Sequence, residues 1–147
     1  MAKITLYDAF TNVSSLQKSR IITFLNKHLD DGKTEQTDIE CALDYAVKDI
    51  PSFGGFVVKV EDDAGEIIGS TIVTKTGMEG FSAAHLLSFL AVHREHRHNG
   101  VFGKMMKKTI EKTSGDLALH VNPTHPNFKN FEEMGFVPRF MEMRLIA

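Results

Sequence analysis

The stretch from residue 85 to residue 114 constrains the fold of this chain more than any other. It begins with a nearly continuous apolar run, HLLSFLAV (85–92), which is typical of a strand buried on both faces. A polar loop rich in His and Arg follows, then Gly100, and then a run of helix formers as far as Ser114. A strand that leads through such a loop into a helix predicts an α/β layer. It also predicts an anion site, because the first helical turn has unpaired N–H groups and the positive end of the helix dipole.

Hydrophobic spacing predicts the other elements of a mixed α/β sandwich in the order β-α-α-β-β-β-α-β-α-β. The expected strands are 4–8, 55–62, 67–77, 85–92, 116–122 and 136–146, and the expected helices are 14–30, 37–50, 100–114 and a short one before Gly135. Ser14 or Ser15 is expected to cap the first helix. Thr37 and Glu40 form a capping-box pattern for the second helix, which Pro51 should end.

Composition favours one soluble domain over residues 1–147, with 42% hydrophobic and 24% charged residues. The charge is uneven, with eight Lys+Arg against twelve Asp+Glu in residues 1–75 and nine against seven afterwards. An acidic chain with one basic segment favours a local anionic ligand over bulk nucleic-acid binding. The longest apolar run is too short to span a bilayer, and no signal-peptide pattern opens the chain. A single cysteine, Cys41, fits a reducing cytoplasm and is expected to be a buried thiol.

The sequence gives little support to two other functions of the basic segment, zinc binding and nucleic-acid binding. His93, His96 and His98 could in principle bind zinc, but they alternate with arginines and no carboxylate or cysteine cluster completes a set. We therefore expect no metal. The lysines between 104 and 112 are more simply explained as a solvated helix face than as a nucleic-acid surface.

The spacing of this loop resembles that of a known family. Val92-x-x-x-x-Arg97-x-x-Gly100-x-Phe102 is similar to V/I-x-x-x-x-Q/R-x-x-G-x-G/A, the acyl-CoA pyrophosphate loop of the GNAT superfamily of N-acyltransferases. The segment NFEEMGF (130–136) also looks like the closing segment of that family. The resemblance covers essentially the whole chain and implies a mostly antiparallel, twisted sheet flanked by helices.

The resemblance also implies roles for individual residues. The strand 85–92 would pair with the pantetheine arm of acetyl-CoA near Leu90 and Val92, and the N–H of Leu90 would hold the oxyanion. The strand 116–122 would splay away from 85–92 to leave a slot for the thioester. The expected cofactor-binding set is completed by Arg97, His98, Asn99, Gly100, Val101, Phe102, Gly103, Asn122 and Asn127.

Three features depart from the family pattern. Phe102 stands where Gly or Ala is usual, and we expect it to be a core residue of the helix. Phe131 stands where many members have the tyrosine that protonates the leaving thiolate. The positions of the usual glutamate base hold Leu86 and Ser88. The candidate bases are therefore Ser88 through a water, His120 and His85, in that order, although a histidine on a strand is more often structural.

The expected function is acetyl-CoA-dependent N-acetyl transfer to a primary amine, by direct attack in a ternary complex. The alternatives are a non-catalytic acyl-CoA-binding module and an acidic interaction domain without CoA. Acidic residues between 26 and 55 favour a cationic acceptor such as a polyamine, an aminoglycoside or lysine, but a solvated surface explains them equally well; they are Asp30, Asp31, Glu35, Asp38, Glu40 and Asp44. We expect a cytoplasmic monomer or homodimer without nucleic-acid or membrane partners.

Overall fold

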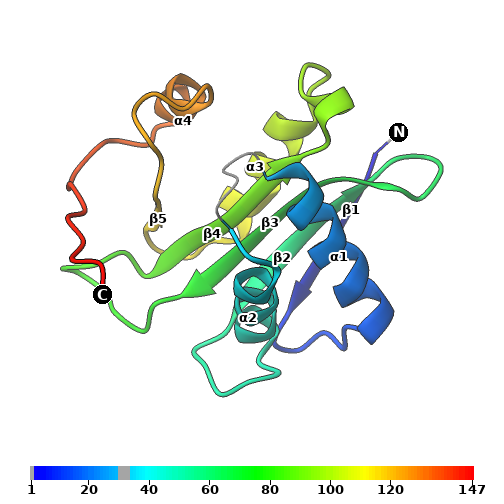
Figure 1. Cartoon of the computed structure of the whole chain (residues 1–147), viewed down its shortest axis with the longest axis horizontal. Helices are drawn as coiled ribbons and strands as arrows, with labels where there is room; N and C mark the ends of the chain where they lie inside the picture. Colours follow the sequence, from blue (N-terminus) through cyan, green and yellow to red (C-terminus); the bar gives the residue numbers. More distant parts are fainter. Residues whose placement is uncertain (1, 30–33) are drawn as a thin grey trace.

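The computed structural model describes residues 2–29 and 34–147 (Figure 1). Its strands are β1 (Lys3–Asp8), β2 (Gly55–Glu61), β3 (Ile67–Lys75), β4 (His85–Val92) and β5 (Leu117–Leu119). Its helices are α1 (Ser15–His28), α2 (Gln36–Val47), α3 (Val101–Lys112) and α4 (Phe128–Glu133), with a 3-10 turn at Arg94–His96.

The five strands form one sheet in the order β1-β2-β3-β4-β5. The pairs β1–β2, β2–β3 and β3–β4 are antiparallel, whereas β5 lies parallel to β4 after the α3 crossover. The predicted mixed α/β fold with a mostly antiparallel sheet is confirmed.

Helices cover both faces of the sheet (Figure 1). On one face, Ile21 and Leu25 of α1 and Leu43 of α2 pack with Val57 and Ile72 in the first core cluster. The second cluster lies on the other face, where α3 contributes Val101, Met105 and Met106, and the strands contribute Val58, Val60, Val73, Leu87 and Val92. Successive strand residues alternate between the two clusters, as a sheet buried on both faces requires.

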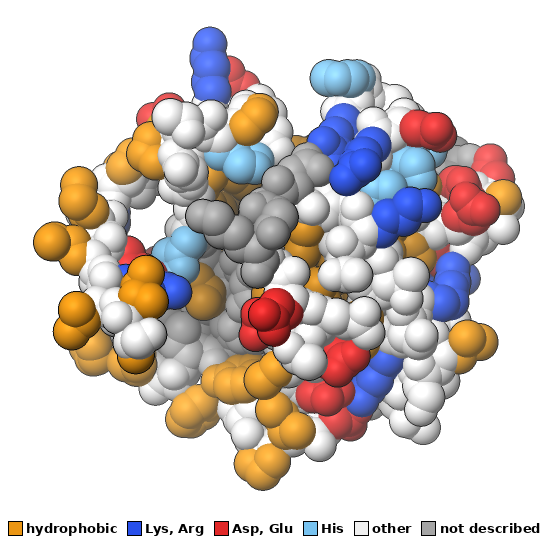
Figure 2. All heavy atoms as spheres, viewed as in Figure 1, with side chains coloured by type: hydrophobic (Ala, Val, Ile, Leu, Met, Phe, Trp, Pro, Cys, Tyr) orange, Lys and Arg blue, Asp and Glu red, His pale blue; other side chains and the backbone are white. Residues whose placement is uncertain are grey.

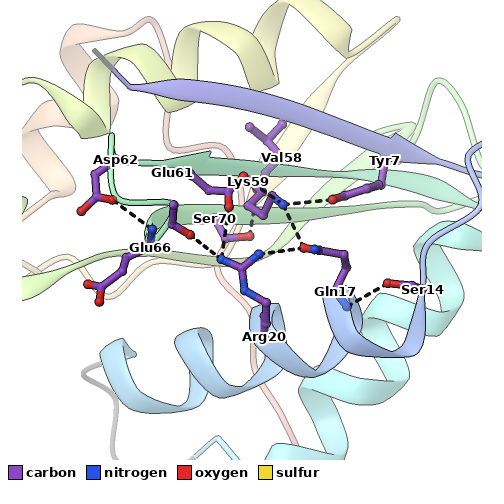
Figure 3. A network of polar contacts seen from close by, with 11 residues as sticks. Tyr7, Ser14, Gln17, Arg20, Val58, Lys59, Glu61, Asp62, Glu66 and Ser70 are labelled. Atoms are coloured by element: carbon purple, nitrogen blue, oxygen red, sulfur yellow. Dashed lines mark hydrogen bonds and ion pairs between the residues drawn. The ribbon is translucent and has the colours of Figure 1, made fainter.

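A polar network fastens α1 to the sheet (Figure 3). Lys59 of β2 is buried, and its Nζ donates to Tyr7 Oη at 3.0 Å and to Gln17 Oε1 at 2.9 Å, and lies 3.1 Å from Glu61 Oε1. Arg20 of α1 donates to Glu61 Oε2 at 3.1 Å. Burial alone would raise the pKa of Glu61, but the hydrogen bonds from Lys59 and Arg20 outweigh it and hold that pKa below its ordinary value.

Several local predictions are wrong at their boundaries. The N-cap of α2 is Glu35 rather than Thr37, and α2 ends at Val47 because Lys48 adopts the left-handed conformation (φ 60°), three residues before Pro51. Ser14 does cap α1, and its hydroxyl accepts from the N–H of Gln17 at 3.1 Å. Cys41 is exposed rather than buried, because it lies on the outer face of α2.

The largest error concerns the last predicted strand, 136–146. Residues 137–147 have no regular secondary structure. Two features explain this: β5 is only three residues long, so it offers a short ladder, and Pro138 has no N–H to donate. The strand predicted at 116–122 is correspondingly shortened to Leu117–Leu119.

Candidate functional site

The candidate site begins at a bulge in β4. Ile72 of β3 pairs with Phe89 and the next residue, Val73, pairs with Leu87, so Ser88 is the extra residue. The bulge changes which face each side chain occupies: Leu87 joins the α3 cluster, whereas Phe89 and Ala91 join the α1/α2 cluster.

Beyond this bulge β4 and β5 separate. The parallel pairing joins only His85–Leu87 to Leu117–Leu119, and in the described part of the chain residues 88–92 have no strand on that side. The N–H of His93 donates to Ile68 O at 2.8 Å, toward β3. Since backbone groups alternate between the two edges of a strand, the N–H groups of Leu90 and Val92 point toward the open edge.

The open edge leads to the start of α3. Gly100 is the N-cap and has φ 87°, a left-handed conformation that favours glycine. The first helical bond runs from the N–H of Lys104 to Gly100 O at 3.2 Å, and no side chain caps the helix. The N–H groups of Val101, Phe102 and Gly103 therefore have no acceptor within the helix. A Cβ added at Gly100 or at Gly103 would meet no atom within 4 Å, so the space beside these two glycines is open.

Arg97 lies beside this loop and also supports the end of α1. Its Nε donates to Val92 O at 3.3 Å, and its Nη2 donates to His28 O at 3.2 Å. Arg94 likewise donates to Lys27 O at 3.4 Å. No sequence pattern indicated this structural role. His98 and Asn99 are exposed, and the Asn99 amide lies 2.9 Å from His96 Nδ1.

Contacts between imidazole rings also join the end of α1 to the loop before α3. The His28 and His93 rings are 4.3 Å apart, and the His93 and His96 rings are 5.5 Å apart. His28 is buried, and its burial, with the nearby charge of His93 and of neighbouring basic groups, lowers its pKa to about 4. Among the described residues no group of three or more His, Cys, Asp or Glu is placed to hold a metal ion.

The three candidate bases occupy different surroundings. Ser88 is half-buried, and its Oγ lies 2.8 Å from Thr74 Oγ1, a partner that the sequence did not suggest. His120 is exposed just beyond β5, with its Nε2 3.7 Å from Glu142 Oε1. His85 is buried on the α3 face, opposite Ser88, and burial together with the charge of Lys75 lowers its pKa.

The two phenylalanines that depart from the family pattern touch one another. The rings of Phe102 and Phe131 meet edge to face at 5.7 Å, and Phe131 meets Phe136 in the same way at 5.8 Å. Phe131 is buried, so this stack joins α4 to α3. The predicted core role of Phe102 is confirmed in that its ring packs against the α3 cluster.

The remaining predicted residues are two asparagines of the expected cofactor-binding set and the acidic residues of the acceptor region. Asn122 is exposed and its Oδ1 accepts from the N–H of Thr124 at 3.0 Å. Asn127 is the N-cap of α4. In the acceptor region, Asp30 and Asp31 lie outside the described residues, Glu35 and Asp38 are exposed, and Asp44 accepts from Lys18 Nζ at 2.9 Å. Most of the acidic groups that the structure describes there are solvated or paired.

An open strand edge that ends at an uncapped helix start is the arrangement expected for the family that the sequence resembles. The sequence profile of the acetyltransferase (GNAT) family matches residues 18–136, and the chain belongs to this family. Family membership supports acyl transfer as the general activity. Comparison with curated proteins gives no match.

Solved structures share the fold. A GNAT family acetyltransferase from Streptococcus pneumoniae is 15% identical, with a TM-score of 0.68 over 100% of this chain and 98% of that one. A ribosomal-protein-alanine N-acetyltransferase from Brucella melitensis is 14% identical, with a TM-score of 0.65 over all of both chains. An aminoglycoside acetyltransferase from an uncultured soil sample is 14% identical, with a TM-score of 0.65 over 100% and 99%. At such identities the likeness concerns the fold alone.

No helix in the described ranges has the length and apolar character needed to cross a membrane.

Proposed function

We propose that this protein transfers an acetyl group from acetyl-CoA to a primary amine of a small molecule or a peptide. The observation that carries the proposal is the separation of β4 from β5 at Ser88, which opens a strand edge that leads directly to the start of α3. A pantetheine arm can pair with that edge as an added strand would, and a pyrophosphate suits the uncapped amides at the helix start.

In this proposal backbone N–H groups bind the co-substrate and stabilise the oxyanion. The N–H groups of Val101, Phe102 and Gly103 hold the pyrophosphate, with Arg97 beside them. The N–H of Leu90, which points toward the open edge, polarises the thioester carbonyl and stabilises the oxyanion as the amine attacks. The C–N bond forms, the C–S bond breaks, and acetylated amine and CoA leave.

The proton of the attacking amine needs an acceptor. Ser88 faces the α1/α2 side of the sheet with Thr74, and this hydroxyl pair can hold a water that relays the proton. His120 is the second candidate, since Glu142 lies near enough to orient its ring. His85 is the third, because it faces α3 rather than Ser88. The departing thiolate takes its proton from water, since Phe131 has none to give.

The alternative is an acyl-CoA-binding module without turnover. The specific observation in its favour is that the buried phenyl ring of Phe131 occupies the place of the usual acid, and that β4 carries no carboxylate. Both functions require acyl-CoA binding, but only the enzyme consumes the thioester.

A thiol-release assay with a panel of amines tests the proposal and separates it from the alternative. Polyamines, aminoglycosides, free lysine and peptides with a free N-terminus cover the acceptor classes. Release of CoA that depends on one class of amine supports the enzyme. Acetyl-CoA binding without release from any of them supports the module.

The proposal includes a cytoplasmic location, because acetyl-CoA is an intracellular co-substrate and a single cysteine suits a reducing compartment. It includes no metal, nucleic-acid or membrane partner.

A further inference from the structure

His93 holds the bend by which the chain leaves β4 and turns toward α3. Its ring Nδ1 accepts from the N–H of Glu95 at 3.2 Å, and its carbonyl oxygen accepts from the N–H of His96 at 2.8 Å. Its own N–H donates to Ile68 O at 2.8 Å, which fixes the residue to β3. The side chain of His93 is therefore the N-cap of the 3-10 turn that follows β4.

This cap requires an uncharged ring. A neutral imidazole has one nitrogen that donates and one that accepts, whereas the imidazolium donates from both. Because Nδ1 of His93 accepts from a backbone N–H, the proton of the neutral ring resides on Nε2. A second proton would enter at Nδ1 and would remove the acceptor of the Glu95 N–H. Proton uptake by His93 therefore breaks the cap of the turn.

The end of α1 packs against the same ring. The His93 ring lies 4.3 Å from the His28 ring, which is buried and lies 4.8 Å from the ring of Phe24. Two arginines of the turn region donate to the last carbonyls of α1, Arg94 to that of Lys27 and Arg97 to that of His28. The positive charge that a helix C-terminus favours is thus supplied already, without a charged imidazole.

Figure 2 shows Lys, Arg and His side chains gathered over the end of α1 and the loop that follows β4 (compare Figure 1). Within the described ranges, the titratable and charged groups near His93 come from α1, from its own loop and from the β2–β3 turn. They are His28 and Lys27, then Arg94, Glu95, His96 and Arg97, and, across a groove beside His96, Asp62 and Asp63. Burial, then the charges of His93, Lys27 and the two arginines, lower the pKa of His28 to about 4, so this neighbour stays neutral when His93 titrates.

The turn that His93 caps is continuous with the loop that exposes the α3 amides. Nδ1 of His96 lies 2.9 Å from the side-chain nitrogen of Asn99, the residue before Gly100. Gly100 has φ 87°, and no side chain caps the helix that it begins, so the N–H groups of residues 101–103 have no acceptor within the helix. Loss of the turn releases the residues that place these amides, and the anion site then loses its arrangement.

We infer that His93 is a positioning residue of the acyl-CoA site, whose neutral ring holds the loop that presents the α3 amides and whose protonation releases that loop. The inference rests on the proposed binding of acyl-CoA at this loop. Its consequence is a co-substrate affinity that falls as the pH drops through the interval in which imidazoles ordinarily titrate, about pH 8 to 5. A purely electrostatic role predicts the opposite sign, because an imidazolium beside the loop would attract the pyrophosphate.

Titration calorimetry with 3′-dephospho-CoA at about pH 7.5 and about pH 5.5 measures the effect. This probe keeps the pyrophosphate but lacks the phosphate monoester of CoA, which itself titrates near pH 6. Wild type should bind the probe at least about threefold more weakly at the lower pH, the order of effect that the loss of one N-cap produces.

Two substitutions of His93 separate the cap from its titration. His93→Asn keeps a side-chain oxygen that caps the turn but does not titrate, so its affinity should fall less than half as much as that of wild type, on a free-energy scale. His93→Ala removes the acceptor and should bind weakly at both pH values. His125→Asn is the matched control, because His125 Nδ1 also accepts from the N–H two residues ahead, that of Asn127, at 3.1 Å. This variant should keep the wild-type pH dependence.

Circular dichroism at both pH values establishes that each variant is folded. A wild-type affinity that is unchanged or higher at the lower pH overturns the inference, and so does a folded His93→Asn variant whose affinity falls as steeply as that of wild type. If the folded wild type binds neither CoA nor the probe at either pH, the proposed function fails together with the inference, so the two failures are distinguishable.

A further measurement needs no variant. In the ligand-free wild type, the backbone amide resonance of Glu95 should move through the pH interval of imidazole titration, because its acceptor is the Nδ1 atom that takes up the proton. A Glu95 amide that does not respond to pH contradicts the cap and overturns the inference.

Discussion

Gly100→Asp is the perturbation that most sharply addresses the candidate anion site. Gly100 has φ 87°, and a Cβ added there would meet no atom within 4 Å, so the substitution is strained by its backbone but meets no steric clash. The strain costs roughly 1–2 kcal/mol of folding free energy. The new carboxylate would stand at the entrance to the uncapped amides of α3, where the pyrophosphate is expected.

The electrostatic cost of that carboxylate can be bracketed. Two unit charges of like sign 4 Å apart repel by about 1 kcal/mol in bulk water and by about 4 kcal/mol near a protein surface. The pyrophosphate carries more than one charge, so we expect CoA affinity to fall by at least tenfold, or about 1.4 kcal/mol. Isothermal titration calorimetry of CoA measures the change directly.

Two further variants show whether a loss of CoA affinity comes from the negative charge or from the backbone strain. Gly100→Asn keeps the side-chain size and the backbone strain but removes the charge, so it should retain most of the affinity that Gly100→Asp loses. Gly65→Asp is the matched control for strain and charge, because Gly65 has φ 81°, also meets no atom within 4 Å, and lies in the β2–β3 turn. It should lower stability without affecting CoA. Equal CoA affinity in folded Gly100→Asp and wild type would refute the reasoning.

Three other side chains give separate tests. Phe131→Tyr should keep the fold and preserve or raise turnover, since its ring packs in the α3 cluster between the rings of Phe102 and Phe136; a large loss of activity in a folded variant would show that Phe131 contacts substrate. If His120 is the base, kcat/KM should show an acid limb between about pH 5 and 8 that His120→Gln removes; identical profiles exclude it. In the folded chain the pKa of His28 is lowered to about 4, so as the pH falls the unfolded chain takes up a proton at this residue before the folded chain does. The free energy of unfolding should therefore decrease as the pH drops from about 6.5 toward 4. By pH 5.5 the loss should be on the order of 1 kcal/mol, and thermal melts of His28→Gln should show a weaker pH dependence than wild type; equal slopes contradict the assignment.

The strand–loop–helix stretch was predictable because its pattern is local. An apolar run, a polar loop and a glycine before helix formers dictate β4, the loop and α3 without reference to the rest of the chain. The directions of the Leu90 and Val92 N–H groups have a non-local cause. They depend on the bulge at Ser88, and a bulge is set by pairing with β3, which one strand's sequence does not reveal.

The errors have physical causes of the same kind. Residues 136–146 have a strand-like sequence, but a strand exists only where another backbone completes its hydrogen bonds, and the short β5 does not. The second role of Arg97 depends on where α1 ends in space, and so does the contact between His28 and His93. The contact between Thr74 and Ser88 depends on the register of β3 and β4, which the sequence does not reveal.

The central claim is that acetyl-CoA binds along the open edge of β4 and against the start of α3. Titration of the isotope-labelled protein with acetyl-CoA, followed through its backbone amide resonances, tests this residue by residue. The account predicts that the largest shifts fall on the amides of Leu90, Val92 and residues 101–103, and that the amides of the β2–β3 turn are unaffected. Saturable binding whose shifts lie elsewhere, or no binding at all by a folded chain, would contradict it.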